Sequence, residues 1–294
     1  MQLTYSLAAF GLTATTLAGT PPQCPSSSQL SCSNTTNTPG TCCFESGGQI
    51  LQTQFWDSNP ASGPADSWTV HGLWPDFCDG TYPQFCDENR QYTNISCILE
   101  SAGKSSLLDF MYKYWTDYQG QTQSFWEHEW GKHGTCYSTL QPSCYGDYNP
   151  QEEVVDYFQR TVDLFQTLNT YEFLKNASIV PSSTKNYTNA QVMTALRAPR
   201  GVNATIECSD GQLEQVYYTF NVKGSIADGT FVPAEPVGEG NGCPATFKYL
   251  PKDLSTTAPR NDTEQCTNST LKTRGAVGGF SRRRLTFPAP LDMW

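Results

Sequence analysis

The sequence predicts an α+β fold in which helices pack on an antiparallel β-sheet core within one disulfide-rich domain. Three observations support this prediction. Apolar residues recur at helical spacing in segments between residues 105 and 197, strand-like segments joined by a hairpin signal follow them, and the chain of 294 residues contains twelve cysteines. A chain of this length can bury a sizeable core.

Two helices are predicted in the first half of the chain. Ser105 and Ser106 could cap one of them, because apolar residues then recur at helical spacing. These are Leu107, Leu108, Met111, Tyr112 and Trp115. The second helix is expected to run from Phe125 to Gly134, where the glycine ends it.

Two more helices are predicted after residue 148. Asn149, followed by a proline and by Glu152 three residues on, is typical of a helix start. The apolar stripe that follows indicates a core helix and comprises Val154, Val155, Phe158, Val162, Phe165 and Leu168. Thr188 and Gln191 form a capping box for a short helix that ends near Arg197.

Three segments are predicted to be strands. Ser67 to Trp74 has strand composition and is expected to end near Pro75. The segments Val202–Cys208 and Leu213–Val222 are joined through Ser209-Asp-Gly211, which is a hairpin signal. Because helices precede these two strands, the order of elements favours an antiparallel sheet over a parallel one.

The first 18 residues are predicted to be a signal peptide. Leu3 to Leu17 is a largely apolar run without a charged side chain. Thr16-Leu-Ala18 resembles a cleavage site, so Gly19 is the expected start of the mature chain. No other stretch approaches the roughly 20 apolar residues that span a bilayer. We therefore expect a soluble mature protein that does not bind a membrane.

The remaining chain is predicted to form one domain, residues 19–252, followed by a tail, residues 253–294. Residues 19–50 carry four cysteines among polar residues and are expected to be stapled loops. The tail is rich in Thr, Ser, Asn, Pro and Arg without a sustained period, which is typical of a flexible, glycosylated segment. Its run Arg282–Arg284 is expected to be a solvated charge run, with a processing site or an anion-binding spot as alternatives.

The cysteine count and the glycosylation sequons both indicate export. An even number of cysteines in an exported chain is typical of a disulfide framework, and no C-x-x-C is present to favour a metal site. Export predicts a secreted, extracellular protein, with a vacuole-like acidic compartment as an alternative. The N-x-[ST] sequons are at Asn34, Asn94, Asn176, Asn186, Asn203, Asn261 and Asn268.

The net charge of −10 argues against a protein that holds nucleic acid stably. Such proteins cluster Lys and Arg to bind phosphates. An enzyme that only turns over its substrate needs less positive charge. In an acidic setting part of the carboxylate charge is neutralised and the histidines become positive. The composition therefore permits catalysis on nucleic acid at acid pH.

All three histidines lie in two short aromatic-rich segments, His71-Gly-Leu-Trp-Pro75 and Phe125-Trp-Glu-His-Glu-Trp-Gly-Lys-His-Gly-Thr-Cys136. Scarce histidines concentrated in this way indicate a functional site. On a helix, Glu129 and His133 share one face, as do His128 and Lys132. His128 and His133 diverge by about 140°, which suits chelation of one metal poorly. A zinc hydrolase, whose H-E-x-x-H motif has histidines four apart, is therefore an alternative and not the leading interpretation.

The same residue types suit cleavage of RNA without a metal or cofactor. RNA carries its own nucleophile, the 2′-hydroxyl group. Two histidines can remove that proton and protonate the departing oxygen, because imidazole titrates near working pH. A lysine and a third, protonated histidine can stabilise the charge on the phosphoryl oxygens.

The two segments resemble the paired active-site motifs of the ribonuclease T2/S-glycoprotein family, in particular its secreted fungal branch. The similarity extends from about Cys24 to Lys252. It implies that His133 is the general base, that His71 is the general acid, and that His128 binds phosphate. Glu129 and Lys132 would polarise the phosphate and stabilise the transition state. The implied product is a 2′,3′-cyclic phosphate, which water then opens to a 3′-phosphate.

The resemblance also implies where bases bind. Trp74, Asp76 and Tyr82 match the primary base pocket, and Phe125 matches a position at the second base site. Core packing is the alternative for each aromatic residue, and Trp126 and Trp130 are expected to lie in the core. Because stacking tolerates any base, low base specificity follows.

The resemblance further implies a pattern of disulfides, after which Cys97 and Cys266 are left over and could bond to each other. Cys136, three residues past His133, would fix the catalytic helix. The implied pairs are Cys24–Cys43, Cys32–Cys78, Cys42–Cys144, Cys86–Cys136 and Cys208–Cys243.

The leading hypothesis is thus a metal-independent, monomeric endoribonuclease that acts on single-stranded RNA with an acid pH optimum and has no stable protein partner. A secreted binding or toxin-like protein that keeps the fold is the second hypothesis. The intact set of His71, Glu129, Lys132 and His133 argues against an inactive enzyme.

Overall fold

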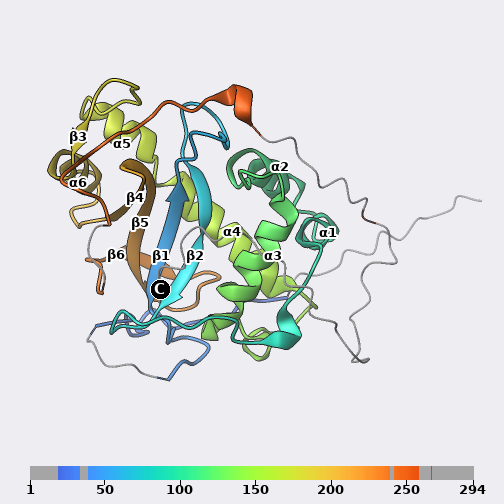
Figure 1. Ribbon diagram of the computed structural model, residues 1–294. Helices are drawn as coiled ribbons and strands as arrows, with labels where there is room; N and C mark the ends of the chain where they lie inside the picture. Colours follow the sequence, from blue (N-terminus) through green and yellow to red (C-terminus); the bar gives the residue numbers. More distant parts are fainter. Residues whose placement is uncertain (1–18, 34–38, 239–241, 258–265, 267–294) are drawn as a thin grey trace, which may run out of the picture. The chain divides into compact units, whose positions relative to one another are not determined.

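The computed structural model describes residues 19–33, 39–238, 242–257 and 266 (Figure 1). The predicted signal peptide, the sequons at Asn34, Asn261 and Asn268, and the run Arg282–Arg284 lie outside these residues. The chain divides into two units, Met1–Thr263 and Glu264–Trp294. The description that follows concerns the first unit.

The first unit is built on an antiparallel sheet with the strand order β2-β1-β5-β4, and β6 also pairs with β5. A small second sheet pairs β3 with β7. The strands are β1 (Gln49–Phe55), β2 (Thr69–Asp76), β3 (Tyr187–Thr188), β4 (Thr205–Ser209), β5 (Gln212–Lys223), β6 (Thr230–Pro233) and β7 (Thr246–Phe247). The predicted α+β class is confirmed.

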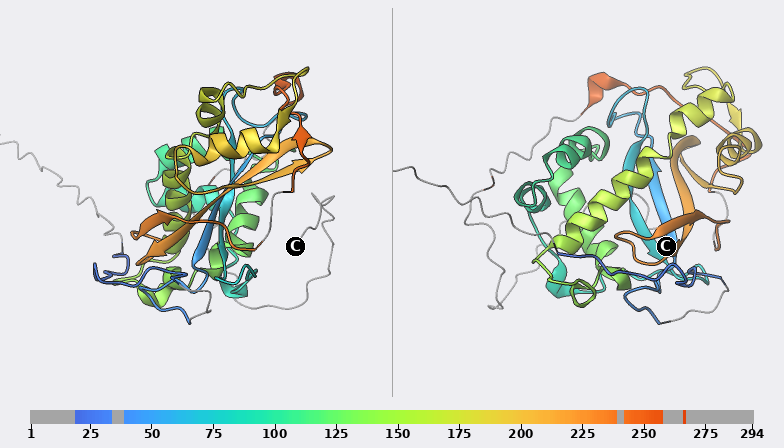
Figure 2. Two further views of the ribbon diagram at one scale, coloured as in Figure 1. Left: turned by 90° about the vertical axis from the view of Figure 1, so that its left-hand side faces the viewer. Right: turned by 180° about the vertical axis from the view of Figure 1, so that it is seen from behind.

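Helices cover the sheet on one face and at one edge. Figure 1 shows α1, α2 and α3 gathered beside β2, and the view from behind in Figure 2 shows α4 crossing the sheet, where it contacts β1 and β2. The helices are α1 (Ile95–Ser101), α2 (Ser105–Tyr114), α3 (Thr122–Lys132), α4 (Glu152–Gln166), α5 (Thr170–Asn176) and α6 (Asn189–Arg197). Short 3-10 turns lie at Glu88–Arg90, Gly134–Cys136, Ser138–Leu140, Pro142–Cys144 and Leu254–Thr256.

Two local signals in the sequence are confirmed. The hairpin between β4 and β5 turns at Asp210 and Gly211, whose φ values of 49° and 72° are those that a tight two-residue loop requires. The capping box of α6 is also present. The Thr188 side chain accepts a bond from the Gln191 backbone N–H, and the Gln191 side chain accepts one from the Thr188 N–H.

Two expected helix starts are wrong. Lys104, and not a serine, occupies the N-cap of α2, and it makes no side-chain cap bond. The N-cap of α4 is Gln151 in a left-handed conformation, so the helix begins two residues later than expected, although the Asn149 backbone N–H bonds to the Glu152 carboxylate as in a capping box.

The predicted helix Phe125–Gly134 is displaced toward the N-terminus. It begins at Thr122 and ends at Lys132, and His133 occupies its C-cap. Gly134 does not end the helix; it begins the 3-10 turn that follows. The predicted strand at Ser67–Trp74 is likewise shifted, to Thr69–Asp76.

Strand β1 was not predicted, although it lies between β2 and β5 in the sheet. Its buried side chains include polar Gln52, Thr53 and Gln54, so it lacks the apolar alternation of a typical strand. These groups bond inside the protein: Gln54 Nε2 donates to Gln52 Oε1, and the Thr170 hydroxyl donates to Gln54 Oε1. A buried polar group is tolerated when it is satisfied in this way.

The core is dominated by aromatic side chains where α3 and α4 meet the sheet. The predicted apolar stripe of α4 is buried, and so are Trp126 and Trp130, as expected. Within the described part of the chain, no helix is long and apolar enough to cross a membrane.

Disulfides hold the loops onto this core. The five pairings that the resemblance implied are present: Cys24–Cys43, Cys32–Cys78, Cys42–Cys144, Cys86–Cys136 and Cys208–Cys243. Cys97 and Cys266 are disulfide-bonded too. The Cys86–Cys136 bridge fastens the segment that follows α3 to the loop that follows β2.

The first residues of the predicted tail contact the domain. The Asp253 N–H donates to the Ser58 carbonyl, and the Thr256 hydroxyl oxygen accepts a bond from the Ala61 N–H. Ordered structure therefore continues a few residues past the expected boundary at residue 252.

Replacing Cys86 and Cys136, which are 50 residues apart, by serine is expected to lower the free energy of unfolding by about 4 kcal/mol, because the unfolded chain gains freedom. The segment after α3 should also lose its fixed position, which shifts the imidazole NMR signals of His133. Urea unfolding and NMR measure the two effects.

The control for this variant removes Cys24 and Cys43, which close a loop of 19 residues. It should cost about 3 kcal/mol and leave the His133 signals in place. Identical His133 signals in both double variants would contradict the expected role of the Cys86–Cys136 bridge.

Candidate active site

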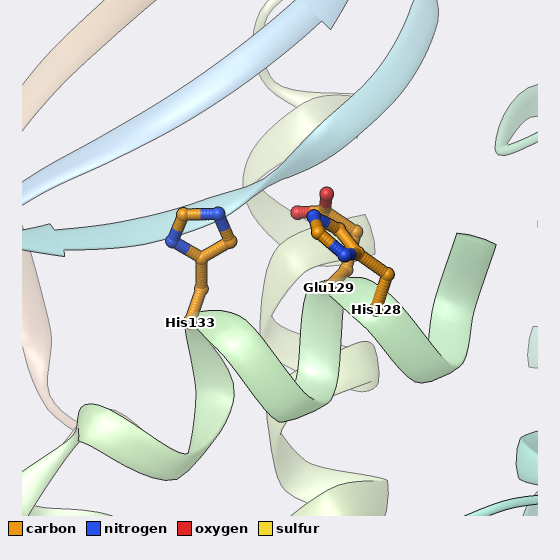
Figure 3. Close-up of side chains that lie close together, drawn as sticks. All are labelled: His128, Glu129 and His133. Carbon is orange, nitrogen blue, oxygen red and sulfur yellow. The ribbon is translucent and has the colours of Figure 1, made fainter. Parts of the chain in front are cut away.

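The two histidine-containing segments meet where β2 faces α3. Tyr157 of α4 connects them, because its hydroxyl lies 3.2 Å from the Leu73 carbonyl of β2 and 3.4 Å from the Glu129 carbonyl of α3. The side chains of His128, Glu129 and His133 all project from α3 toward β2 (Figure 3). The predicted site residues of the two motifs are therefore brought together.

A β-bulge aims His71 at α3. Thr53 of β1 pairs with Gly72 and the next residue, Gln54, pairs with Val70, so His71 is an extra residue on β2. The Thr53 hydroxyl bonds to both the N–H and the carbonyl of Gly72. Bulges of this kind redirect a side chain next to many active sites.

The carboxylate of Glu129 is completely buried between β2 and α3. Its Oε2 accepts a 2.9 Å hydrogen bond from the Trp74 indole Nε1, and its Oε1 lies 3.6 Å from His71 Nε2. A Cβ on Gly72 would lie 2.0 Å from Glu129 Oε2. Only glycine therefore leaves room for this carboxylate beneath the strand.

His71 is held from three sides. Its Nδ1 lies 3.1 Å from Gln215 Oε1, its ring stacks on Phe55 with centroids 3.7 Å apart, and the Trp74 ring lies 4.6 Å away at an interplanar angle of 80°. Since the amide oxygen can only accept, His71 carries a proton on Nδ1 and directs Nε2 toward Glu129.

His133 is buried and stacks on the other side of the site. Its ring lies parallel to the indole of Trp74 at 4.7 Å. The Nε2 atom is buried and has no hydrogen-bond partner within the described part of the chain. A buried nitrogen of this kind is available to a substrate group.

Burial shifts the acid–base properties of all these groups. It lowers the pKa of His71 well below 6.5, and it lowers the pKa of His133 likewise, with a further contribution from the Lys132 ammonium. Desolvation followed by Lys132 also lowers the pKa of His128. In contrast, burial raises the pKa of Glu129 to about 8, against the opposing effects of the Trp74 bond and Lys132.

The expectation that His128 and His133 diverge too far to suit chelation of one metal is wrong. A ring nitrogen of His128, a carboxylate oxygen of Glu129 and a ring nitrogen of His133 all lie within 4.8 Å of one another. The reason is that His133 occupies the C-cap, with φ −110°, and no longer follows the helical rotation. The residues could therefore hold a metal ion, although the adjacent Lys132 ammonium and the Trp74 bond to Glu129 both oppose it.

The residues expected to bind bases lie around this centre. Asp76 is the last residue of β2, and Tyr82 follows in the next loop; both are partly exposed. Phe125 is half-buried, with its ring 5.7 Å from that of His71. Trp74 differs from the expectation in one respect: one face of its indole is covered by His133, so only the opposite face could receive a base.

Sequence reasoning missed Phe55, Gln215 and Tyr157, which position the site. They lie on β1, β5 and α4, far along the chain from both motifs. None of them belongs to a local pattern that indicates such a role.

The chain matches known proteins over most of its length. Residues 33–228 match the model of the Ribonuclease T2 family. Ribonuclease Trv of Hypocrea rufa is 54% identical over 229 residues, which cover 78% of this chain and 98% of that protein. Ribonuclease T2 of Aspergillus oryzae is 51% identical over 233 residues, which cover 79% of this chain and 84% of that protein.

The fold also matches a solved structure. The crystal structure of Actibind, described as a T2 ribonuclease, is 52% identical with a TM-score of 0.75, and it covers 78% of this chain and 98% of that chain. Some relatives are longer, since the matches to two ribonuclease T2-like proteins cover 63% and 54% of those proteins.

Replacing Trp74 by phenylalanine is expected to raise the pKa of Glu129 further above about 8, because the indole bond favours the ionised carboxylate. The carboxyl carbon signal of Glu129, followed by NMR against pH, measures this shift. Trp126→Phe is the control, since Trp126 lies on the same helix as Glu129 but its indole N–H bonds to the carbonyl of Trp115, at the end of α2. If the pKa of Glu129 were the same in Trp74→Phe as in Trp126→Phe, the assigned hydrogen bond between Trp74 and Glu129 would be wrong.

Proposed function

The chain belongs to the ribonuclease T2 family and is an endoribonuclease of the T2 type. On this premise we propose that it cleaves single-stranded RNA to 2′,3′-cyclic phosphates and then to 3′-phosphates. We propose further that it does so without a metal and at acid pH. The observation that carries this mechanism is the group formed between β2 and α3 by the partly buried imidazole of His71, the buried imidazole of His133 and the buried carboxylate of Glu129. The two imidazoles can supply one proton acceptor and one proton donor, and Lys132 directly precedes His133 in the chain.

His133 acts as the general base in this proposal. Its Nε2, buried without a partner among the described residues, takes the proton of the 2′-hydroxyl group while the 2′-oxygen bonds to phosphorus. The low pKa of His133 keeps the imidazole neutral at acid pH, which a base requires. The stacked indole of Trp74 fixes the plane of the ring.

His71 acts as the general acid. As the bond between phosphorus and the 5′-oxygen breaks, Nε2 gives its proton to that oxygen. Gln215 holds the Nδ1 proton and so fixes which nitrogen faces the substrate. Water then opens the cyclic phosphate with the two roles exchanged: His71 removes the water proton, and His133 returns a proton to the 2′-oxygen.

Lys132 and Glu129 complete the electrostatics. The half-buried Lys132 makes no salt bridge within the described ranges, so its ammonium can bind the phosphoryl oxygens. Glu129, whose carboxyl group is protonated at acid pH because burial raises its pKa to about 8, would polarise the phosphate together with Lys132. The exposed His128 would bind phosphate in its protonated form.

Low base specificity follows from stacking as the main mode of base binding. Trp74, on the face not covered by His133, would take the first base together with Asp76 and Tyr82, and Phe125 beside His71 would take the second. The Asp76 carboxylate can accept a hydrogen bond from a donor on the base.

A metal-dependent hydrolase is a second candidate, favoured by the 4.8 Å cluster of His128, Glu129 and His133. It differs from the first in a simple observable, because a chelator would abolish its activity.

We also propose secretion of a glycosylated monomer. Disulfide bonding of every described cysteine supports an oxidising compartment. Of the four described sequons, Asn176 and Asn186 are exposed, and Asn94 and Asn203 are partly exposed. Asn203 Nδ2 donates to Glu235 Oε2 at 2.8 Å, so this sequon would have to release that bond to carry a glycan.

The deciding experiment is cleavage of a defined single-stranded RNA at about pH 5 with excess EDTA. We expect cyclic-phosphate products from the wild type and a rate lower by about 100- to 10,000-fold for His133→Ala. Lys175→Ala, on the exposed surface of α5, should cleave like the wild type. Loss of wild-type cleavage in EDTA would favour the metal-dependent candidate instead.

The dependence of kcat/KM on pH should be bell-shaped and lie on the acid side of neutrality. Activity rises with pH as His133 loses its proton, and falls as His71 loses its proton, and both pKa values lie below 6.5. Burial raises the pKa of Glu129 to about 8, so its carboxyl group is protonated at acid pH, and Glu129→Gln should lower the maximal rate while leaving the falling limb in place. A falling limb that moves to lower pH in Glu129→Gln would contradict this expectation, because it would mean that Glu129 is ionised beside His71 at acid pH.

A further inference from the structure

Phe85 is an exposed aromatic side chain beside the site, with no role in the chemistry described above. Its side chain is 46% exposed, and it is the aromatic one among the large exposed hydrophobic residues of the described chain, the others being Val232, Val237 and Leu254. Leaving a phenyl ring in water is unfavourable. An exposed aromatic residue at the edge of a site is therefore a candidate contact for a ligand.

The backbone holds Phe85 in a conformation that a bulky residue rarely adopts, with φ at 51°. Its N–H donates to the carbonyl of Lys132, and the next residue, Cys86, is bridged to Cys136. The Cys86 N–H also bonds to the Thr135 hydroxyl oxygen. These three links tie Phe85 directly to the end of α3 that carries Lys132.

The ring of Phe85 continues a row of rings that crosses the site. From Phe125 the row passes through His71, Trp74 and His133 to His128, with neighbouring centroids between 4.6 and 6.4 Å apart. Phe85 extends it at 6.2 Å from His128, with the two ring planes at 79°. Because this contact is edge-on, His128 does not stack on Phe85.

We propose that Phe85 is a stacking platform for a nucleobase of the RNA strand outside the two nucleotides joined by the cleaved bond. The inference rests on the proposed function, in which Trp74 with its neighbours and Phe125 take the two bases next to that bond. Phe85 lies beyond the phosphate-binding His128, at the end of the row opposite Phe125. Every base has a face that an aromatic ring can stack on, so such a contact binds longer strands without adding sequence preference.

The test compares two substrates that contain the same cleavable linkage. One is a dinucleoside monophosphate, and the other is a decanucleotide with a single ribonucleotide in a 2′-deoxy strand. For Phe85→Ala we expect KM for the decanucleotide to rise about 5- to 20-fold more than KM for the dinucleotide. Phe85→Trp should restore tight binding of the decanucleotide, whereas Phe85→Leu, which is apolar without a π face, should not.

The backbone bond to Lys132 persists in all three variants, so their fold is expected to persist, and thermal unfolding checks this. Val232→Ala, which trims another exposed apolar side chain, should leave both KM values unchanged. Equal effects of Phe85→Ala on the two substrates, or a Phe85→Leu variant that binds like the wild type, would overturn the proposal. If the wild type cleaved neither substrate, the proposed function itself would fail.

Discussion

The buried carboxylate of Glu129 is the group on which the rest of the site depends. Removing a carboxylate from water is costly unless a proton or a partner compensates. The protein supplies the Trp74 indole bond on one oxygen and His71 near the other. It also provides the space, because β2 has glycine at position 72, where a Cβ would overlap the carboxylate. The burial of Glu129 on α3 therefore requires glycine at position 72 of β2.

This burial links the protonation of Glu129 and His71. Burial raises the pKa of Glu129 to about 8 and lowers that of His71 well below 6.5, so of these two groups 3.6 Å apart the carboxyl group is the one that holds a proton more readily. Lys132 and the neighbouring histidines disfavour further positive charge. An anionic phosphate reverses that balance, since it stabilises imidazolium. Substrate binding and the charging of the site are therefore coupled, which reconciles a chain of net charge −10 with a polyanionic substrate.

The sequence predicts those parts of the fold and site that depend on neighbouring residues. The α6 capping box, the turn at Asp210 and the apolar stripe of α4 are local, and all three are found. Strand β1 was missed because its buried residues are polar and are satisfied only by distant groups. Gln215 and Phe55 were missed for a related reason: their contacts with His71 exist only once the sheet has formed.

The spacing within the first motif has a structural cause that only the sheet register reveals. His71 and Trp74 are three residues apart, so in a regular strand their side chains would point to opposite faces. Both nevertheless contact Glu129. The bulge at His71 resolves the conflict, because one extra residue brings His71 onto the face that carries Gly72 and Trp74. A motif with an odd spacing between two residues of one site therefore requires an irregular strand, and the Thr53 hydroxyl, by bonding both backbone groups of Gly72, stabilises that irregularity.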